Sequence, residues 1–404
     1  MPVSRLGCMS ITRRRSAFRT VVAVAVSSLV ALGPAGAAAA ATGRPSPLQR
    51  DSDALHEGGV TGVSVTLETP RGLRTARSGV ADLSTGRSVP RNEFVRIGST
   101  TKTFVATVLL QLAGEGRLSL DDTVDTWLPG VVEGRGNDGR RITLRQLLQH
   151  TSGLPDYISD VVPDLSAAGY RANRWTTYTS EQRVAFAMQH SPSSEPGTDW
   201  EYSNTNYVLA GMVIKAVTGH SWEQEVQARI VRPLHLTHTL TPGNRPFLPG
   251  PHARNYQQFE PGGTMTDTTT AYLPFDGDAD GSMISTAEDT NRFFKALVGG
   301  GLLAPAQLAE MQRTVEVPAD HGAPPGTRDG LGLDWTPLSC GGGYWGHSGT
   351  GFGYMAWPAS DGRSAVTVSL HSRPGDENTA ARQIRQVTEL VDHALCSSRD
   401  ETPQ

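Results

Sequence analysis

Lysine is scarce in this 404-residue chain: its 36 lysine and arginine residues include only three lysines, Lys102, Lys215 and Lys295. Arginine keeps its proton at any working pH, whereas a buried lysine can lose it. One of the three lysines closes the sequence S-T-T-K, which starts at Ser99. Because residues i and i+3 of a helix share a face, this spacing predicts a serine hydroxyl beside an amine that can accept its proton.

Cysteine is equally scarce, and Cys8 lies in a segment that we expect to be removed. Residues 1–41 begin with arginines, continue through the apolar run Val21–Leu32 and end in alanines. This order predicts a signal peptide and a secreted, extracellular protein. The apolar run is shorter than the roughly 20 residues that span a bilayer, so no stable membrane anchor is expected. Cys340 and Cys396 then remain, and two cysteines in an exported chain favour one disulfide over a metal site.

An excess of positive charge is also missing. Without residues 1–41, which hold five arginines and no acid, 31 basic side chains face 40 acidic ones, a net charge of −9. A mildly acidic exported chain is a poor candidate for nucleic-acid binding. The remaining residues, with ordinary apolar content, are numerous enough to bury a large core.

Strand patterns occur near both ends of the chain. Alternating residues predict a hairpin near the N-terminus and four short strands between glycine turns near the C-terminus: Val60–Leu67 and Leu73–Val80, then Gly330–Trp335, Tyr344–His347, Tyr354–Pro358 and Ala365–Leu370. A last helix is predicted over Asn378–Cys396, where apolar residues fall on one side.

Helical patterns fill the middle of the chain. The nearly continuous apolar run Phe104–Leu112 predicts a helix that is buried on several sides, with Ser99 just before it. Capping-box patterns predict three helix starts, at Thr143, Thr179 and Ser221. Two further helices are expected over Asn206–Thr218, closed by Gly219, and over Thr286–Val298.

These elements predict an α+β fold, with an antiparallel sheet flanked by helices plus an inserted mainly helical domain. We expect residues 45–120 and 282–398 to form the two parts of the sheet domain, and residues 121–281 the inserted domain. Residues 1–41 are the signal peptide and residues 399–404 a tail. A cleft between the sheet domain and the helical domain is where a ligand is expected to bind.

The pair Ser99 and Lys102 has the parts of an activated nucleophile. Burial beside the apolar run would lower the pKa of Lys102 and supply a neutral amine. The backbone N–H groups of a helix N-terminus would stabilise a developing oxyanion. The pattern S-x-x-K alone is common, so the assignment depends on further motifs.

Two such motifs follow in the chain, Y-S-N at Tyr202 and H-S-G-T at His347. With S-T-T-K they resemble the S-x-x-K, Y-x-N and [KH]-[ST]-G elements of serine D-alanyl-D-alanine carboxypeptidases and class C-type β-lactamases, the penicillin-binding serine hydrolases. The flanks F-V-R-I-G-S-T-T-K-T-F, L-L-Q-H-T-S-G-L-P-D-Y and Y-S-N-T-N-Y-V-L-A-G-M-V-I match as well. The resemblance implies a β-lactamase/transpeptidase-like fold, and Cys340 and Cys396 resemble the disulfide of the secreted carboxypeptidases.

The resemblance also implies a role for each motif residue. Ser99 would be acylated and Lys102 would take its proton. Tyr202, partly as a phenolate, would relay a proton to the leaving amine, and Asn204 would bind the acyl-side carbonyl. His347 would replace the family's usual lysine. The oxyanion hole and substrate-binding strand are expected from backbone N–H groups and side chains of four residues: Ser99, Ser348, Gly349 and Thr350.

One departure from the family pattern limits the substrate. Carboxypeptidases of this kind often place an arginine on the strand before H-S-G to bind the substrate carboxylate. Asp334 occupies the matching position, and no arginine or lysine occurs between Arg328 and Arg363. We expect Asp334 to repel a carboxylate, which weakens the carboxypeptidase interpretation.

Two patterns that suggest metal binding are set aside. Asp276-Gly-Asp-Ala-Asp-Gly begins like a calcium loop, but its twelfth position is Ala287 rather than a glutamate, so a turn that lines the cleft is favoured. His235 and His238 have H-x-x-H spacing without a third ligand nearby, which favours a surface loop. No metal and no organic cofactor is expected.

The sequence therefore predicts a secreted, monomeric serine hydrolase that forms an acyl-enzyme. Its predicted activity is that of a D-alanyl-D-alanine carboxypeptidase on peptidoglycan-type peptides, with β-lactams as inhibitors or substrates. The alternatives are an esterase, a D-aminopeptidase or a β-lactamase of the same family, and a non-catalytic module that binds penicillin or peptidoglycan.

Overall fold

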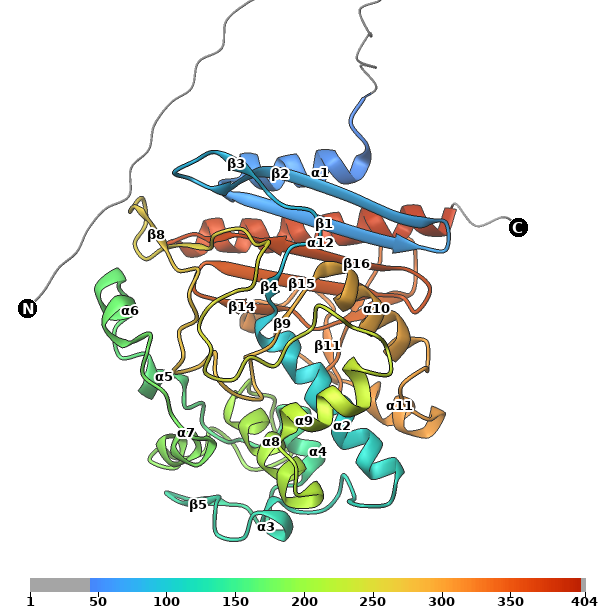
Figure 1. The fold of residues 1–404 in the computed structure, drawn as a ribbon. Coiled ribbons are helices and arrows are strands. Elements are labelled where there is room, and N and C mark those ends of the chain that lie inside the picture. Colours follow the sequence, from blue (N-terminus) through green and yellow to red (C-terminus); the bar gives the residue numbers. More distant parts are fainter. Residues whose placement is uncertain (1–43, 401–404) are drawn as a thin grey trace, which may run out of the picture. The chain divides into compact units, whose positions relative to one another are not determined.

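A ten-stranded sheet organises the chain in the computed structural model, which describes residues 44–400 (Figure 1). Nine strands lie in the order β10-β11-β12-β13-β15-β16-β1-β2-β3, all antiparallel, and β14 pairs with β15. Their bounds are β1 Gly62–Thr69, β2 Gly72–Asp82, β3 Arg87–Ser88, β10 Val315–Glu316, β11 Arg328–Asp329, β12 Asp334–Pro337, β13 Gly343–Gly346, β14 Gly349–Gly351, β15 Tyr354–Ser360 and β16 Ala365–Leu370.

The pairing of β1 with β16 joins the two ends of the described chain, with Val65 opposite Val368. On one face of the sheet lie the helices α1 (Pro47–Glu57) and α12 (Glu377–Asp400) (Figure 1). They cover a core made mainly of aliphatic side chains. On the other face, α10 (Ala287–Val298) packs against β15, β16 and β1. Asn291 of α10 fixes this contact by donating to the carbonyl of Thr66 at 2.9 Å.

Helices make up most of the middle of the chain: α2 Thr101–Gly114, α3 Val124–Trp127, α4 Leu144–Leu148, α5 Ile158–Val161, α6 Ala167–Asn173, α7 Ser180–Ala187, α8 Thr205–Thr218, α9 Trp222–Val226 and, further on, α11 Pro305–Met311. A π-helical turn, Gln227–Val231, extends α9. Helices α2 and α8 pack together in the largest core, which explains why both are apolar on nearly every side.

Short elements connect these layers. The strands β4 (Val95–Arg96) and β9 (Ile284–Ser285) pair next to the start of α2, and β5 (Glu133–Gly134) pairs with β6 (Asn137–Asp138). A three-stranded sheet contains β17 (Ser372–Arg373), β7 (Tyr256–Gln258) and β8 (Met265–Asp267). Two 3₁₀ turns span Gly98–Thr100 and Ala319–His321.

Most predicted elements are present. All three capping boxes form, at Thr143, Thr179 and Ser221, and Gly219 closes α8 in the left-handed region (φ 78°). The predicted α+β fold is confirmed. The division into a sheet domain and an inserted helical domain stays a prediction, since the chain from Pro45 onward groups into one compact unit. The predicted signal peptide and residues 401–404 of the predicted tail lie outside the described residues.

One predicted strand was placed wrongly. Residues 330–333 form a turn in which the N–H of Gly330 donates to the carbonyl of Leu333, and the strand begins only at Asp334. Gly332 has φ +70°, and a Cβ there would lie 2.5 Å from the hydroxyl of Tyr207. This close approach to α8 requires glycine, so the Gly-Leu-Gly pattern marks a turn rather than a strand.

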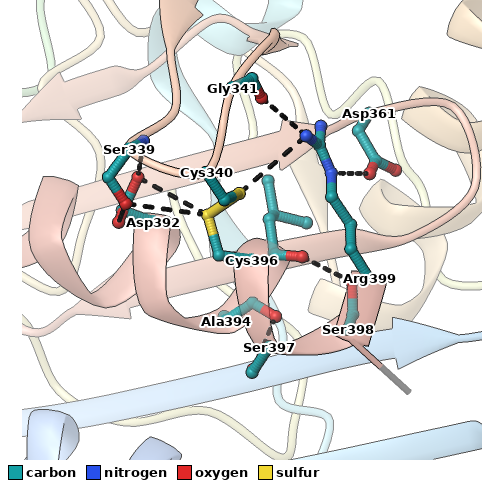
Figure 2. Close-up of a disulfide and its surroundings, with 11 residues drawn as sticks. Ser339, Cys340, Gly341, Asp361, Asp392, Ala394, Cys396, Ser397, Ser398 and Arg399 are labelled. Atoms are coloured by element: carbon teal, nitrogen blue, oxygen red, sulfur yellow. Dashed lines mark hydrogen bonds and ion pairs between the residues drawn. A yellow bond between two sulfur atoms is a disulfide. The ribbon is translucent and has the colours of Figure 1, made fainter. Parts of the chain in front are cut away.

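The predicted disulfide is present and ties a loop of the sheet to the last helix (Figure 2). Cys340 lies between β12 and β13, and Cys396 lies on α12. Polar contacts support the same junction: the N–H of Ser339 donates to Asp392 at 2.7 Å, and Arg399 donates to the carbonyl of Gly341 at 2.6 Å (Figure 2).

Within residues 44–400, no helix is long and apolar enough to cross a membrane.

Candidate active site

Ser99 and Lys102 meet at the start of α2. The 3₁₀ turn Gly98–Thr100 leads into the helix, and the two side chains are joined by a hydrogen bond of 3.0 Å between Lys102 Nζ and Ser99 Oγ. Lys102 is fully buried and makes two more hydrogen bonds, to Asn204 Oδ1 at 2.7 Å and to the carbonyl of Asp280 at 2.6 Å. The amine is therefore held in a fixed position beside the serine hydroxyl.

The surroundings of Lys102 favour its neutral form. Burial lowers the pKa of Lys102 to about 8, while the negative charges of Asp280 and Asp156 act in the opposite direction. Burial also raises the pKa of Asp280 to about 7, although Lys102 lowers it and Tyr157 donates a hydrogen bond to its Oδ2 at 2.9 Å. With this pKa, about a tenth of Lys102 is an unprotonated amine at pH 7 and about half at pH 8.

Tyr202 lies against Ser99 with its ring between two basic groups. Its hydroxyl lies close to the Ser99 side chain, which lowers the pKa of Tyr202. The imidazole of His150 stacks on its ring at 4.2 Å between centroids, and Lys102 Nζ is 5.1 Å from the ring centre. Burial and nearby carboxylates such as Asp156 raise the pKa of Tyr202 well above its ordinary value. Burial is the largest cause of this rise, so the structure favours a neutral phenol over the partial phenolate that was expected.

Asn204 connects the lysine to a second acid. Its Oδ1 accepts from Lys102, and its Nδ2 donates to Asp156 Oδ2 at 2.8 Å. An amide nitrogen carries two hydrogens, so one N–H of Asn204 is left for a ligand. Burial raises the pKa of Asp156, and its hydrogen bonds from Ile158 and Asn204 oppose that rise.

The H-S-G-T segment places β14 against the start of α2. The Thr100 hydroxyl donates to the carbonyl of His347 at 2.7 Å. A Cβ on Gly349 would lie 1.8 Å from the Ile97 carbonyl oxygen, and a Cβ on Gly98 would lie 2.9 Å from the backbone N of Thr350. Glycine at both positions therefore lets the two backbone segments that carry the N–H groups of Ser99 and Thr350 come together, as the oxyanion-hole prediction requires.

His347 is a neutral histidine in this site. Its Nδ1 lies 2.8 Å from the carbonyl of Ser348, so Nδ1–H donates and Nε2 is the acceptor. Burial lowers the pKa of His347; Asp334 raises it and Lys102 lowers it further. The imidazole therefore does not supply the positive charge that the family's usual lysine carries.

These residues surround one cavity of about 860 Å³. Six of the eight residues predicted for the site line it: Ser99, Tyr202, Asn204, His347, Ser348 and Thr350. Lys102 and Gly349 lie directly behind this surface, bonded to Ser99 and packed against Ile97 respectively. The structure therefore brings together residues that are up to 251 positions apart in the sequence.

The sequence also matches a family model described as Beta-lactamase over residues 47–389. The chain belongs to the beta-lactamase family. The family resemblance stated from the three motifs is thereby confirmed, as is the β-lactamase/transpeptidase-like fold. This is a family of serine hydrolases, in agreement with a buried amine beside a serine.

Solved structures of D-specific amidases are similar to this beta-lactamase family member. A D-stereospecific amidohydrolase from Streptomyces sp. is 37% identical with a TM-score of 0.77, covering 87% of this chain and 98% of that one. A D-amino acid amidase from Ochrobactrum anthropi SV3, complexed with L-phenylalanine amide, is 29% identical with a TM-score of 0.75, covering 87% and 97%.

Curated relatives match over a shorter segment. Penicillin-binding protein 4* of Bacillus subtilis (strain 168) is 31% identical over 166 residues, which are 40% of this chain and 33% of that protein. The Protein flp of Staphylococcus aureus is 36% identical over 143 residues, or 27% of its length. The matched segment thus spans about a third or less of these curated relatives.

Asp334 lines the cavity, but a second carboxyl group accompanies it. It lies on β12 opposite Asp329 of β11, and the two carboxyl groups are hydrogen-bonded to each other. Burial raises the pKa of both, and Trp200 Nε1 donates to Asp329 Oδ2 at 2.7 Å. A pair that retains a proton repels a substrate carboxylate less than a free aspartate would, so the sequence-based objection is weaker than expected.

The carboxylates of the turn Asp276–Gly281, which precedes α10, contact other side chains of the protein. Asp276 accepts from the Tyr354 hydroxyl at 3.0 Å, and Asp278 pairs with the buried Arg183 at 3.3 Å. Asp276 and the nearby Gly281 line the cavity, as the alternative to a calcium loop predicted. Across residues 44–400, no group of three or more histidine, cysteine, aspartate or glutamate side chains is placed to hold a metal ion.

Sequence reasoning missed two residues that shape the site. His150 supports Tyr202, and its Nδ1 accepts from the N–H of Ser203 at 3.2 Å; burial lowers its pKa well below the ordinary value. Asp280 supplies both a carbonyl and a charge to Lys102. His150 lies in the flank L-L-Q-H-T-S-G, so its sequence signal was available, whereas nothing in the sequence links Asp280 to Lys102.

Proposed function

We propose that this protein is a serine amidohydrolase that cleaves amide or ester bonds of compounds containing a D-amino acid. The observation that carries the proposal is the buried Lys102, whose pKa is about 8 and whose Nζ lies 3.0 Å from Ser99 Oγ. An amine with this pKa is suited to act as a general base near neutral pH.

The proposed acylation uses Lys102 as the base. Lys102 takes the proton of the Ser99 hydroxyl while Ser99 Oγ bonds to the substrate carbonyl carbon. The carbonyl oxygen becomes an oxyanion, which the N–H groups of Ser99 and Thr350 stabilise. The bond to the leaving group then breaks, and its nitrogen or oxygen takes a proton through the neutral Tyr202 hydroxyl, which lies against Ser99.

Deacylation reverses these steps with water. A water molecule loses a proton through Tyr202 and Lys102, bonds to the acyl carbon and releases Ser99 with its proton restored. Asn204 keeps one free N–H for the acyl-side carbonyl, as its bond to Asp156 uses only one hydrogen. His347, neutral and with Nε2 free to accept, orients the leaving group without adding charge.

The similar structures support a D-configured substrate, because they are a D-stereospecific amidohydrolase and a D-amino acid amidase and are covered almost completely. The D-alanyl-D-alanine carboxypeptidase activity predicted from the motifs is a narrower form of the same proposal. It has support in the 31% identity to a penicillin-binding protein. Acylation of Ser99 by β-lactams is part of the proposal, since it uses the same nucleophile.

A substrate panel tests this proposal. The purified protein is incubated with D- and L-phenylalanine amide, D-phenylalanine p-nitroanilide, a p-nitrophenyl ester, diacyl-D-alanyl-D-alanine and a chromogenic cephalosporin. We expect D-phenylalanine amide to be hydrolysed at least about 100-fold faster than its enantiomer, and the Ser99→Ala variant to be inactive. Equal rates for the enantiomers would refute the stereochemical part, and a penicillin adduct without turnover of any substrate would favour the non-catalytic alternative.

We also propose export, on the basis of the N-terminal pattern of residues 1–41. The full chain is expressed in a Gram-positive host, and the product in the culture medium is sequenced from its N-terminus. We expect a chain that begins close to residue 42. Retention of the uncut chain inside the cells would contradict the proposal.

A further inference from the structure

Arg373 is a cation without a partner in the wall of the catalytic cavity. It lies on β17, lines the cavity together with Ser99, and is half-buried. Its Nη1 is buried without a hydrogen-bond acceptor, and within residues 44–400 its guanidinium makes no hydrogen bond or ion pair. A guanidinium stays charged at working pH and carries five N–H donors in a planar fork.

The groups around Arg373 have other partners. Gln257, opposite Arg373 in the β17–β7 pairing, accepts from the N–H of Gly353 at 2.9 Å. The next residue, Gln258, accepts from the N–H of Gly375 at 3.0 Å. Asp376, the nearest carboxylate in sequence, accepts from Thr379 N at 2.8 Å in the first turn of α12. These hydrogen bonds fix the frame around the guanidinium and leave its donors free.

A second arginine, Arg183, has the partners that Arg373 lacks. Arg183 is fully buried, and it pairs with Asp278 at 3.3 Å and donates to the carbonyls of Leu273 and Pro274 at 3.1 and 3.2 Å. Burial lowers the pKa of Arg373, and no neighbouring carboxylate offsets that effect. A desolvated cation without a counter-charge is unfavourable, so an anion from outside the chain is its natural partner.

We propose that Arg373 is a specificity-determining residue that binds a carboxylate of the substrate inside the catalytic cavity. This inference rests on the proposed hydrolase function, which it narrows to substrates that carry a carboxylate as well as the scissile bond. A guanidinium donates two parallel hydrogen bonds to the two oxygens of a carboxylate, which fixes the orientation of the ligand. Arg373 lies beyond Arg363, outside the segment in which the sequence offered no cation.

Binding to a catalytically dead protein tests the proposal without depending on turnover. The Ser99→Ala variant is titrated calorimetrically with N-acetyl-D-phenylalanine, N-acetyl-D-phenylalanylglycine and N-succinyl-D-phenylalaninamide, each compared with the compound in which the carboxylate is a primary amide. These acids place the carboxylate at different positions along the cavity. We expect at least one acid to bind roughly 10- to 100-fold more tightly than its amide, and to lose that preference when Arg373→Gln is added.

Two further variants separate recognition from a structural role. Arg373→Lys keeps the charge but not the fork, so it should retain part of the preference. Arg382→Gln removes an exposed arginine of α12 that donates to Thr379 Oγ1, and should leave the preference intact. Thermal melting confirms that each variant is folded.

The proposal is overturned if no acid in the series binds more tightly than its amide, or if the preference survives Arg373→Gln. Equal weakening of acids and amides by Arg373→Gln would also overturn it, because that pattern indicates a structural role. Failure of the hydrolase proposal gives a different result, namely no turnover of any substrate by the wild-type protein. The comparison of acid and amide binding to Ser99→Ala can still be interpreted in that case.

Discussion

The charge of Asp280 controls how much of Lys102 is available as a base, and replacing it should change the pH dependence of catalysis. The pKa of Lys102 is about 8, so about a tenth of the amine is neutral at pH 7. Asp280 raises that pKa, and Asp280→Asn removes the charge while the carbonyl that accepts from Lys102 at 2.6 Å stays in place. If the substitution lowers the pKa of Lys102 from about 8 to about 7, about half of the amine is neutral at pH 7, and the acylation rate should rise about fivefold.

The assay is kcat/KM for D-phenylalanine p-nitroanilide between pH 6 and pH 9, which reports the ionisation of the free enzyme. The wild-type rate should rise with pH and level off above about pH 8, because the base must be deprotonated. The Asp280→Asn profile should level off at lower pH. Glu316→Gln removes an exposed carboxylate of β10 that pairs with Arg328 at 3.4 Å, and should leave the profile unchanged. An unchanged profile in Asp280→Asn, or a midpoint at higher pH, would refute this reasoning.

Three further predictions concern the nucleophile, its neighbouring strand and the disulfide. Lys102→Arg keeps the charge but removes the deprotonable amine, so kcat/KM should fall by about 100- to 10,000-fold; activity within tenfold of wild type would exclude Lys102 as the base. Gly349→Ala places a Cβ 1.8 Å from the Ile97 carbonyl oxygen, so β14 must move. We expect kcat/KM for the p-nitroanilide to fall by about 100-fold, and full activity would contradict the close packing. Replacing Cys340 and Cys396 by serine opens a covalent loop with a sequence separation of 56, so the free energy of unfolding in urea titrations should fall by about 2–4 kcal/mol. A fall of less than about 1 kcal/mol would argue against a stabilising role of the disulfide.

Local patterns were sufficient to predict much of the fold. Capping boxes depend on residues three positions apart, and all three formed as predicted, at Thr143, Thr179 and Ser221. The strand β16 has the predicted bounds Ala365–Leu370, because its alternation matches its pairing with β1. The helix α1 was missed although Ser46 caps it and Pro47 starts it, since only Leu48 and Leu55 mark its apolar side.

The residues of the site also divide into those that a short sequence motif marks and those that no motif marks. The motif residues Ser99, Lys102 and Tyr202 could be found because each motif is a short pattern with a known chemical use. The contact of Asp280 with Lys102 and the position of Arg373 could not, because they come from the path of the chain and not from spacing. The protonation states of the site residues were harder still to predict. Burial and carboxylates from several parts of the sequence raise the pKa of Tyr202, and these act together only in the folded chain.

The central claim is that Ser99 becomes acylated, and trapping the acyl-enzyme tests it most directly. The protein is mixed with a fluorescent penicillin and, separately, with a D-phenylalanine ester, quenched in acid within seconds, digested and mapped by mass spectrometry. We predict one adduct, on the peptide that contains Ser99, and none in Ser99→Ala. An adduct on another residue, or labelling that persists in Ser99→Ala, would contradict the account.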